Sequence, residues 1–222
     1  LLGVKRNRRL VPTRWAITAV DSAIAAKLLE AIKSENKVID HIEVYNASYL
    51  GNKFTIILFP GPYRLEMVEI WHPLTIWTRN TRKPILHWVR EDKPNQFTEQ
   101  DGGMMAARLS VLEHLARRGR QATVFIIREI TPDYYAPVGN WHIRLTTAHA
   151  LAQPMLRSND PKEVIELLNI ILKNERLLNT IIGKSRIFDR LYTQKKLDHY
   201  LQTRCFRPIN RNTSTTNPSM EN

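Results

Sequence analysis

MMAARLSVLEHLARRGRQATVFIIREI, residues 104–130, decides the fold class, because it sets an amphipathic helix directly before a buried strand. The helix covers residues 104–121, and four side chains share its apolar face: Met105, Leu109, Leu112 and Leu115. Gly119, near the end of this segment, is in the position of a C-terminal cap that ends the helix. Residues 122–130 are a continuous apolar run of the kind that forms a buried strand. The sequence therefore predicts a domain in which helices pack on a sheet.

Further strands are predicted upstream, where short apolar runs are separated by turn residues. They cover residues 38–50, 53–60, 63–71 and 85–91. The third run places its side chains alternately on two sides: Tyr63, Leu65 and Met67 on one, Val68 and Ile70 on the other. Because the connections between the first three runs are short, we expect an antiparallel meander.

Two more helices are predicted, one before these strands and one near the C-terminal end of the chain. The first covers residues 19–34, with Thr18 and Asp21 as a capping pair at its start. Its apolar stripe recurs every four residues, at Val20, Ile24, Leu28 and Ile32, and Ala25 and Leu29 broaden it. The second covers residues 160–178, with Asp160 at the N-cap and Pro161 at the first helical position. Residues 140–145 fit either a short strand or the entry to a helix.

The net charge of +12 is concentrated at the two ends of the chain. Residues 1–14 carry five basic residues and no acid, and residues 182–211 carry eight basic and two acidic residues. Clustered basic residues bind phosphate backbones by releasing counterions, although the same charge also suits a solvated arm. The residues that we expect to contact nucleic acid are Lys5, Arg6, Arg8, Arg9, Arg14, Arg117, Arg118 and Arg120.

These patterns predict an α+β fold with a central, mainly antiparallel sheet, flanking helices and a disordered basic C-terminal tail that carries a short linear motif. We expect a basic arm over residues 1–14, an α+β body over 15–182, a basic segment with the motif over 183–203 and a disordered tail over 204–222. The chain begins at Leu1 and not at a methionine, so we expect it to be part of a longer protein.

The composition disfavours several classes of protein. No apolar run approaches the ~20 residues of a membrane-spanning helix and no signal segment opens the chain, so we expect no membrane partner. Cys205 is the single cysteine, which excludes an internal disulfide framework and a cysteine-based zinc site within this sequence. A reducing, cytoplasmic location fits these features best.

The sequence lacks the common catalytic signatures, namely a Walker loop, G-x-G-x-x-G, G-x-S-x-G and H-E-x-x-H. We therefore expect no metal site, and the sequence identifies no cofactor. An alternative is a metal-dependent hydrolase acting on nucleic acid through carboxylates, whose simpler role is surface charge or capping. Its candidate carboxylates are Asp21, Glu66, Glu69, Asp101 and Glu129. This alternative requires three of them to converge in one concave site.

Tryptophans beside arginines suggest a second kind of nucleic-acid contact, because such rings can stack on bases next to phosphate contacts. Such pairs include Arg14-Trp15 and Trp77-Thr78-Arg79. Buried tryptophans more often serve a core or its rim, and both interpretations stay open for Trp15, Trp71, Trp77, Trp88 and Trp141. An RNA-binding module is a further alternative.

QKKLDHYL, residues 194–201, keeps large apolar side chains between a basic segment and a polar tail. In one helical turn Leu197, Tyr200 and Leu201 fall on one side and can enter an apolar pocket, while Gln194 fits a separate polar niche. This spacing is similar to the box by which many replication and repair proteins bind the sliding clamp PCNA. We expect these four residues to bind PCNA; the alternative is a last amphipathic turn that packs on its own body.

Three segments together resemble the archaeal Nre family, whose members are described as DNA repair proteins: RRLVPTRWAITAVDS (8–22), residues 102–141 and QKKLDHYL. The resemblance runs from about Gly3 to Leu201, and QKKLDHYL falls at the family's clamp-binding motif. It implies a DNA-damage-response factor that works with PCNA, and an N-terminal cysteine-rich metal-binding segment that this sequence does not include. Met104-Met105 and Arg144-Leu145 depart from the family's aromatic pair and Arg-Glu pair.

Overall fold

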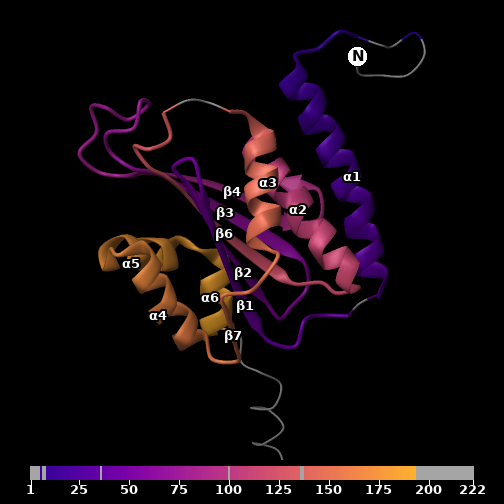
Figure 1. Ribbon diagram of the computed structural model, residues 1–222. Coiled ribbons are helices and arrows are strands. Elements are labelled where there is room, and N and C mark those ends of the chain that lie inside the picture. Colours follow the sequence, from indigo (N-terminus) through magenta and orange to yellow (C-terminus); the bar gives the residue numbers. More distant parts are fainter. Residues whose placement is uncertain (1–5, 7–8, 36, 100, 136–137, 194–222) are drawn as a thin grey trace, which may run out of the picture.

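The predicted strands lie side by side in one sheet that separates two groups of helices (Figure 1). A computed structural model describes residues 6, 9–35, 37–99, 101–135 and 138–193. The strands are β1 Ile42–Tyr49, β2 Asn52–Phe59, β3 Arg64–Trp71, β4 Ile85–Lys93, β5 Gln96–Phe97, β6 Thr123–Ile130 and β7 Leu156–Ser158. In this part of the chain the seven strands follow the order β5-β4-β3-β6-β2-β1-β7.

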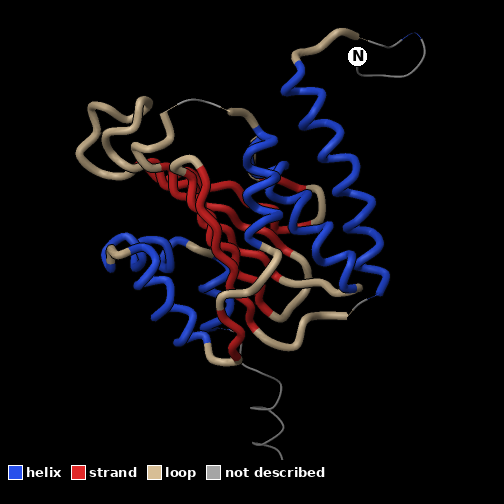
Figure 2. The backbone as a smooth tube through the Cα atoms, viewed as in Figure 1, coloured by secondary structure: helices blue, strands red, loops and turns tan. Residues whose placement is uncertain are grey.

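Helices cover both faces of the sheet (Figure 2). They are α1 Thr13–Glu35, α2 Gly102–Arg118, α3 Asn140–Ala150, α4 Pro161–Leu172, α5 Glu175–Lys184 and α6 Arg186–Thr193. Helices α1 to α3 lie on one face and α4 to α6 on the other (Figures 1 and 2). Neighbouring strands are antiparallel except β3 and β6, which are parallel. The predicted α+β class with a mainly antiparallel sheet and flanking helices is confirmed.

The sheet has an apolar core on each face, because its central strands are buried on both sides. In β6, Val124 and Ile126 pack with α1 to α3, whereas Phe125 and Ile127 pack with α4 to α6. Each fully buried side chain of this size stabilises the fold by roughly 1.5–3 kcal/mol. The alternation predicted for residues 63–71 is confirmed in the same way.

The predicted meander is wrong at one place, because β6 lies between β2 and β3. Thr123, at the start of β6, is the register partner of both Phe59 and Arg64. The link over residues 60–62 spans this width, and the Pro62 carbonyl accepts a hydrogen bond from Thr123 Oγ1 at 2.8 Å. The physical reason is burial, since a run as apolar as residues 123–130 is most stable in the middle of a sheet covered on both faces.

Helix α1 begins at Thr13, earlier than the predicted start at residue 19. Thr18 therefore does not cap it. Ala25, Leu29 and Ile32 of the predicted stripe are buried, and the buried face also includes Asp21. Val20 and Ile24, which we expected to be buried, are about half exposed. The buried face is therefore centred on the residues that broadened the predicted stripe, and the buried aspartate in it gives no apolar signal.

The ends of the other helices follow local sequence signals, except that the helix predicted over residues 160–178 is two helices in the structure. Asp101 caps α2 by accepting a hydrogen bond from the Met104 amide, and Gly119 ends that helix in the left-handed conformation, as predicted. Residues 140–145 belong to helix α3. The helix predicted over 160–178 is divided instead, because Lys173 turns left-handed and Asn174 caps α5.

The packed body continues past residue 182, where we expected a boundary. Helix α6 buries Ile187 and Phe188 in the second core, and the Ser185 hydroxyl donates to Glu66 at 2.9 Å. The predicted tail over 204–222 lies outside the described residues. None of the helices in the described part of the chain is long and apolar enough to cross a membrane.

Candidate functional site

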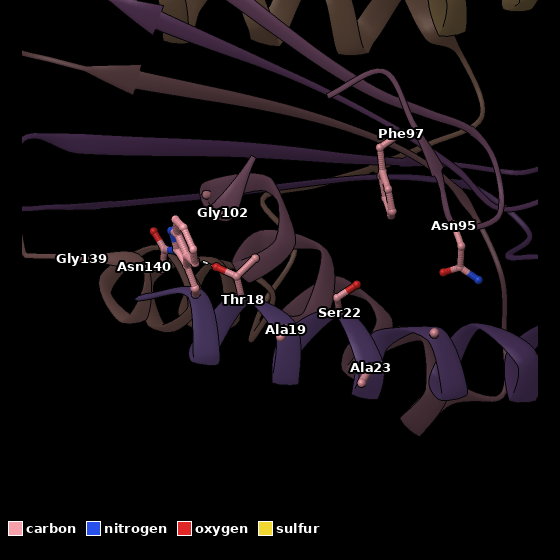
Figure 3. A pocket seen from close by; sticks show the side chains of 12 residues that line it. Thr18, Ala19, Ser22, Ala23, Asn95, Phe97, Gly102, Gly139 and Asn140 are labelled. Carbon is pink, nitrogen blue, oxygen red and sulfur yellow. Dashed lines mark hydrogen bonds between the residues drawn. The ribbon is translucent and has the colours of Figure 1, made fainter. Parts of the chain in front are cut away.

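A groove with a volume of about 1040 Å³ runs along α1, between this helix and the N-terminal ends of α2 and α3 (Figure 3). The β4–β5 hairpin contributes Asn95 and Phe97 to its far side. We call this feature the α1 groove. Its lining residues are Trp15, Thr18, Ala19, Ser22, Ala23, Ala26, Asn95, Phe97, Gly102, Gly103, Gly139 and Asn140.

Glycines hold the three helices of the groove close together. A β-carbon on Gly102 would lie 2.5 Å from Asn140 Nδ2 and 3.2 Å from Thr18 Oγ1. On Gly103 it would lie 3.0 Å from the Asp101 carboxylate. The glycine pair therefore lets the first turn of α2 approach α1 and α3 more closely than other residues would allow. The same approach brings Asn140 to within 3.4 Å of Thr18, to which it donates a hydrogen bond.

The wall formed by α1 is built from small residues spaced three and four apart. Ala19, Ala23 and Ala26 leave the groove open, and Thr18 and Ser22 supply hydroxyl groups. Residues at this spacing share one face of a helix. The residues that line the groove include no acid and no base. A ligand would therefore be held by hydroxyl, amide and backbone groups, which suits a polar or anionic group better than a metal ion.

Two helix N-termini meet at this groove, one from α2 and one from α3. The first turn of a helix leaves backbone N–H groups unpaired within the helix and carries partial positive charge. The Asp101 carboxylate accepts from one such N–H in α2 at 2.7 Å. Gly139, the N-cap of α3, offers no side-chain cap and has φ 81, a conformation that glycine adopts without strain. The N-terminus of α3, which has no side-chain cap, is therefore the one suited to phosphate oxygens, whereas Asp101 already occupies an N–H group of α2.

A buried charge network lies beneath Gly103, on the surface of the sheet. Glu69 Oε1 would be 3.5 Å from a β-carbon at Gly103, and it accepts a hydrogen bond from Arg128 at 2.5 Å. Arg128 also donates to the Asn52 side chain at 2.9 Å. His87 reaches the other oxygen of Glu69 at 3.8 Å. The network fixes the position of β3, β4 and β6 under the groove.

The charges in this network shift the pKa values of Glu69, His87 and Asp101. Burial alone would raise the pKa of Glu69, but the contacts with His87 and Arg128 outweigh it, so that this pKa is lowered. The contact with Glu69 raises the pKa of His87 to about 9, and Glu99 adds to the effect. Burial raises the pKa of Asp101, and the nearby Glu69 charge acts in the same direction. At neutral pH, His87 is therefore a cation and Glu69 an anion.

An ion pair fixes α1 to α3 beside the groove. Asp21, which is 1% exposed, accepts a hydrogen bond from Arg144 in α3. The second carboxylate oxygen of Asp21 is buried and has no hydrogen-bond partner among the described residues. A buried carboxylate without its cation is costly, so Arg144 stabilises the position of the groove wall.

The predicted basic residues fall into two separate regions. Arg6 and Arg9 are exposed just before α1, and Arg14 lies in its first turn, whereas Lys5 and Arg8 lie outside the described residues. The second region is the C-terminal end of α2, about 24 Å along the helix from the groove. It holds Arg117, Arg118 and Arg120. The groove is thus associated with the basic arm and not with the second region.

Arg118 has a structural partner. It donates two hydrogen bonds to the carboxylate of Glu43, at 2.5 and 2.9 Å, and Glu43 is completely buried in β1. Arg117 is exposed, and Arg120 is half-buried. The pairing of Arg118 reflects cross-element packing, which a single sequence does not reveal.

The carboxylates proposed for a hydrolase do not converge. Glu69 and Asp101 approach each other on the α1 side of the sheet, and Asp21 is paired within the helical layer. Glu129 hydrogen-bonds to His72 at 2.8 Å, and Glu66 accepts from Arg90 at 2.9 Å. Both alternate in their strands with residues of the first core, so they face the opposite side of the sheet. Among the described residues, no group of three or more His, Cys, Asp and Glu could hold a metal ion.

The predicted clamp-binding residues lie outside the described part of the chain: Gln194, Leu197, Tyr200 and Leu201. Conversely, the groove residues Thr18, Ser22, Asn95 and Asn140 were not predicted from the sequence. Small polar residues and alanines carry no chemical signature, and only the glycine pair before a strong helix hints at close packing there.

Comparison with known proteins places these segments in a family. Residues 1–78 match the family Archaeal Nre, N-terminal, and residues 90–200 match Archaeal Nre, C-terminal. DNA repair protein NreA of Haloferax volcanii is 35% identical over 198 residues, which cover 85% of this chain and 47% of that protein. No solved structure matches the chain.

Two further relatives come from Archaeoglobus fulgidus. Its DNA repair protein NreA is 40% identical over 159 residues, which cover 68% of this chain and 38% of the relative. Its DNA repair protein NreB is 38% identical over 148 residues, which cover 64% of this chain and 36% of the relative. The chain therefore spans less than half the length of each of these three relatives.

Proposed function

Because the chain belongs to the archaeal Nre family, we propose that it acts in DNA repair, contacting DNA through the α1 groove and binding the sliding clamp PCNA through residues 194–201. One observation carries the first part of this proposal. Eight of the twelve groove residues come from the two segments 8–22 and 102–141, which are far apart in the sequence and carry the family resemblance. Their meeting at one hollow surface supports a shared function there.

The chemistry of the groove suits a DNA backbone. Phosphate oxygens are bound in proteins by helix N-termini, hydroxyl groups and amides, and the groove combines all three. Arg6 and Arg9 precede α1, so their positive charge lies on the chain that leads directly to the groove wall. Phosphate contacts of this kind position a protein on DNA without reading its sequence.

Filling the groove tests the DNA contact. Ala23 is exposed in the groove, and Ala23→Met adds a long side chain there while keeping a good helix former in α1. We expect it to weaken duplex binding at least about tenfold, which corresponds to ~1.4 kcal/mol. Ala31→Met is the matched control, because Ala31 is exposed on the same helix and does not line the groove.

Fluorescence anisotropy with labelled duplex DNA, at two salt concentrations, measures both variants. Equal affinities for Ala23→Met and the unaltered chain would remove the groove from the proposal. RNA of the same sequence binding more tightly than DNA would favour the alternative of an RNA-binding module.

The proposed clamp contact is supported by the place of the motif in the chain, directly after the last packed helix. Helix α6 is anchored in the second core and ends at Thr193, and the motif follows directly. A short segment that enters a groove on the clamp would tether the body to replicated or damaged DNA and raise its local concentration there. Tight DNA binding by the body is then unnecessary.

Calorimetry of the whole chain against an archaeal PCNA tests this contact. We expect Leu197→Ala with Tyr200→Ala to abolish binding, because these side chains supply the apolar anchors. Lys195→Ala with Lys196→Ala is the control, since both lysines lie on the solvent side of the predicted turn. Unchanged affinity for the first double variant would exclude this motif as the contact.

A further inference from the structure

A folded loop, residues 72–84, leaves the sheet between β3 and β4 (Figure 1). Two buried threonines hold it in shape. Thr78 Oγ1 donates to the His72 carbonyl at 2.5 Å and lies 2.6 Å from Thr75 Oγ1, while the Thr78 amide donates to Thr75 Oγ1 at 3.1 Å. These hydrogen bonds hold the part of the loop between His72 and Thr78 in a defined turn.

Aromatic rings connect the loop to the turn before α3 and to α3 itself. Trp77 packs edge-on against Trp71, with ring centroids 5.6 Å apart. Its other neighbour is Tyr134, 5.2 Å away and tilted by only 30°. Tyr134 in turn stacks on His142 at 6.0 Å and 21°. Trp77, Tyr134 and His142 thus form a series of ring contacts, in which the first pair is tilted and the second is stacked.

Trp77 is exposed, and the loop that carries it has a positive net charge. Trp77 is 44% exposed, although tryptophan is normally largely buried. Three cations of the same loop are exposed: Arg79, Arg82 and Lys83. No aspartate or glutamate occurs between residues 70 and 90. Nearby, Glu69 pairs with Arg128 and Glu129 with His72, while Asp133 is exposed in the facing turn.

We propose that the 72–84 loop binds unpaired bases of single-stranded DNA, with a base stacking on Trp77 and the phosphates meeting Arg79, Arg82 and Lys83. This inference rests on the proposed function only in taking DNA as the ligand. Trp77 lies within the first segment that matches the family, whereas Arg79, Arg82 and Lys83 fall between the two matched segments. Base faces are accessible in single strands and covered in a duplex, so this surface would complement the duplex contact of the α1 groove.

An anionic membrane is the competing occupant, since Leu74 is also exposed on the loop. The ring series favours DNA. Contacts with Trp71 and Tyr134 hold the Trp77 ring on the protein, where a base can stack on its exposed part, whereas insertion into lipid would need no such support.

Anisotropy of the whole chain with labelled oligothymidine, and with a duplex of equal length, tests the proposal. We expect Trp77→Ala to weaken oligothymidine binding roughly 5- to 100-fold and to leave duplex binding unchanged. Trp77→Phe keeps a ring face and should retain most of the affinity. Leu74→Ala is the matched control, because it removes an exposed apolar side chain of the same loop without removing a ring, and it should bind DNA like the unaltered chain.

A second measurement keeps the test independent of any local disturbance by Trp77→Ala. Replacing Arg79, Arg82 and Lys83 by Gln should reduce the slope of log affinity against log salt for oligothymidine by about 2, as expected for three lost phosphate contacts. An unchanged slope, or equal oligothymidine binding by Trp77→Ala and the unaltered chain, would overturn the inference. Loss of binding to phosphatidylserine vesicles in Leu74→Ala and Trp77→Ala, with DNA binding retained, would also overturn it and assign the loop to membranes.

The same experiment separates this inference from the proposed function. If duplex binding still falls in Ala23→Met while Trp77→Ala has no effect, the groove proposal stands and the loop proposal fails. If oligothymidine binding depends on Trp77 while Ala23→Met leaves duplex binding intact, the loop proposal stands and the groove proposal fails.

Discussion

His87 and His114 show at the scale of single residues how position determines charge in this protein. His87 lies beside Glu69 and Glu99, and the contact with Glu69 raises its pKa to about 9. His114 lies in α2, where burial and then the positive charge of Arg118 lower its pKa to about 4. The first histidine is therefore a cation at neutral pH, and the second is uncharged.

These shifts predict opposite effects of pH on stability. His87 stabilises the fold below pH 6.5, and this contribution is lost as pH rises through 9, because the folded state binds the proton more tightly. His114 stabilises the fold above pH 6.5, and its contribution is lost as pH falls toward 4. Histidine NMR resonances followed from pH 4 to 9 check both values. Two titrations near 6.5 would contradict the description of both sites.

The glycines of the chain allow a matched pair of substitutions. Gly102→Ala pushes the Asn140 side chain away, which narrows the groove at little cost in stability because the clashing atom ends a flexible side chain. Gly183→Ala meets no atom within 4 Å and should stabilise α5 by roughly 0.5–1 kcal/mol. We expect Gly102→Ala, and not Gly183→Ala, to weaken duplex binding. Urea unfolding and anisotropy measure the two effects, and equal affinities would argue against a role for the groove.

At the scale of elements, the sequence predicts best where a pattern is long and has one interpretation. Helix α2 and the five longer strands were predicted because their apolar runs are bounded by clear caps and turns. Strands β5 and β7 have two and three residues, too few to show an alternation. The buried face of α1 was predicted only in part, because Asp21 is buried although it is charged, while Val20 and Ile24 are exposed. The position of β6 depends on long-range packing, which local patterns do not contain.

The docking of α1 depends on an ion pair whose two partners are unequally buried. Asp21 is 1% exposed, whereas the Arg144 side chain is 34% exposed and can reach water when unpaired. Asp21→Ala should therefore cost about 1–3 kcal/mol. Arg144→Ala should cost more, because it leaves a carboxylate buried without its cation.

Urea unfolding of Asp21→Ala and Arg144→Ala measures which of the two variants loses more stability. The exposed pair Arg186–Asp92 gives the control, and Arg186→Ala should cost no more than about 1 kcal/mol. The reverse order for Asp21→Ala and Arg144→Ala would show that the pair does not hold α1 in the manner described.

At the scale of the whole molecule, the sheet separates the proposed DNA contact from the helices that lead to the proposed clamp motif. The side covered by α1 to α3 carries the α1 groove, and the nearby 72–84 loop is joined to α3 through the contact of Tyr134 with His142. The side covered by α4 to α6 leads to the predicted clamp motif. From the sequence, the family and the fold class could be predicted. The groove could not, because it exists only where alanines, glycines and small polar residues from distant segments meet.

The central claim is that DNA lies in the α1 groove, and hydrogen exchange of the backbone amides with and without duplex DNA tests it most directly. We predict slower exchange in residues 13–26 of α1 and in the first turns of α2 and α3 when DNA is bound, with no change in α4 and α5. Protection of α4 and α5, with none along α1, would contradict the claim.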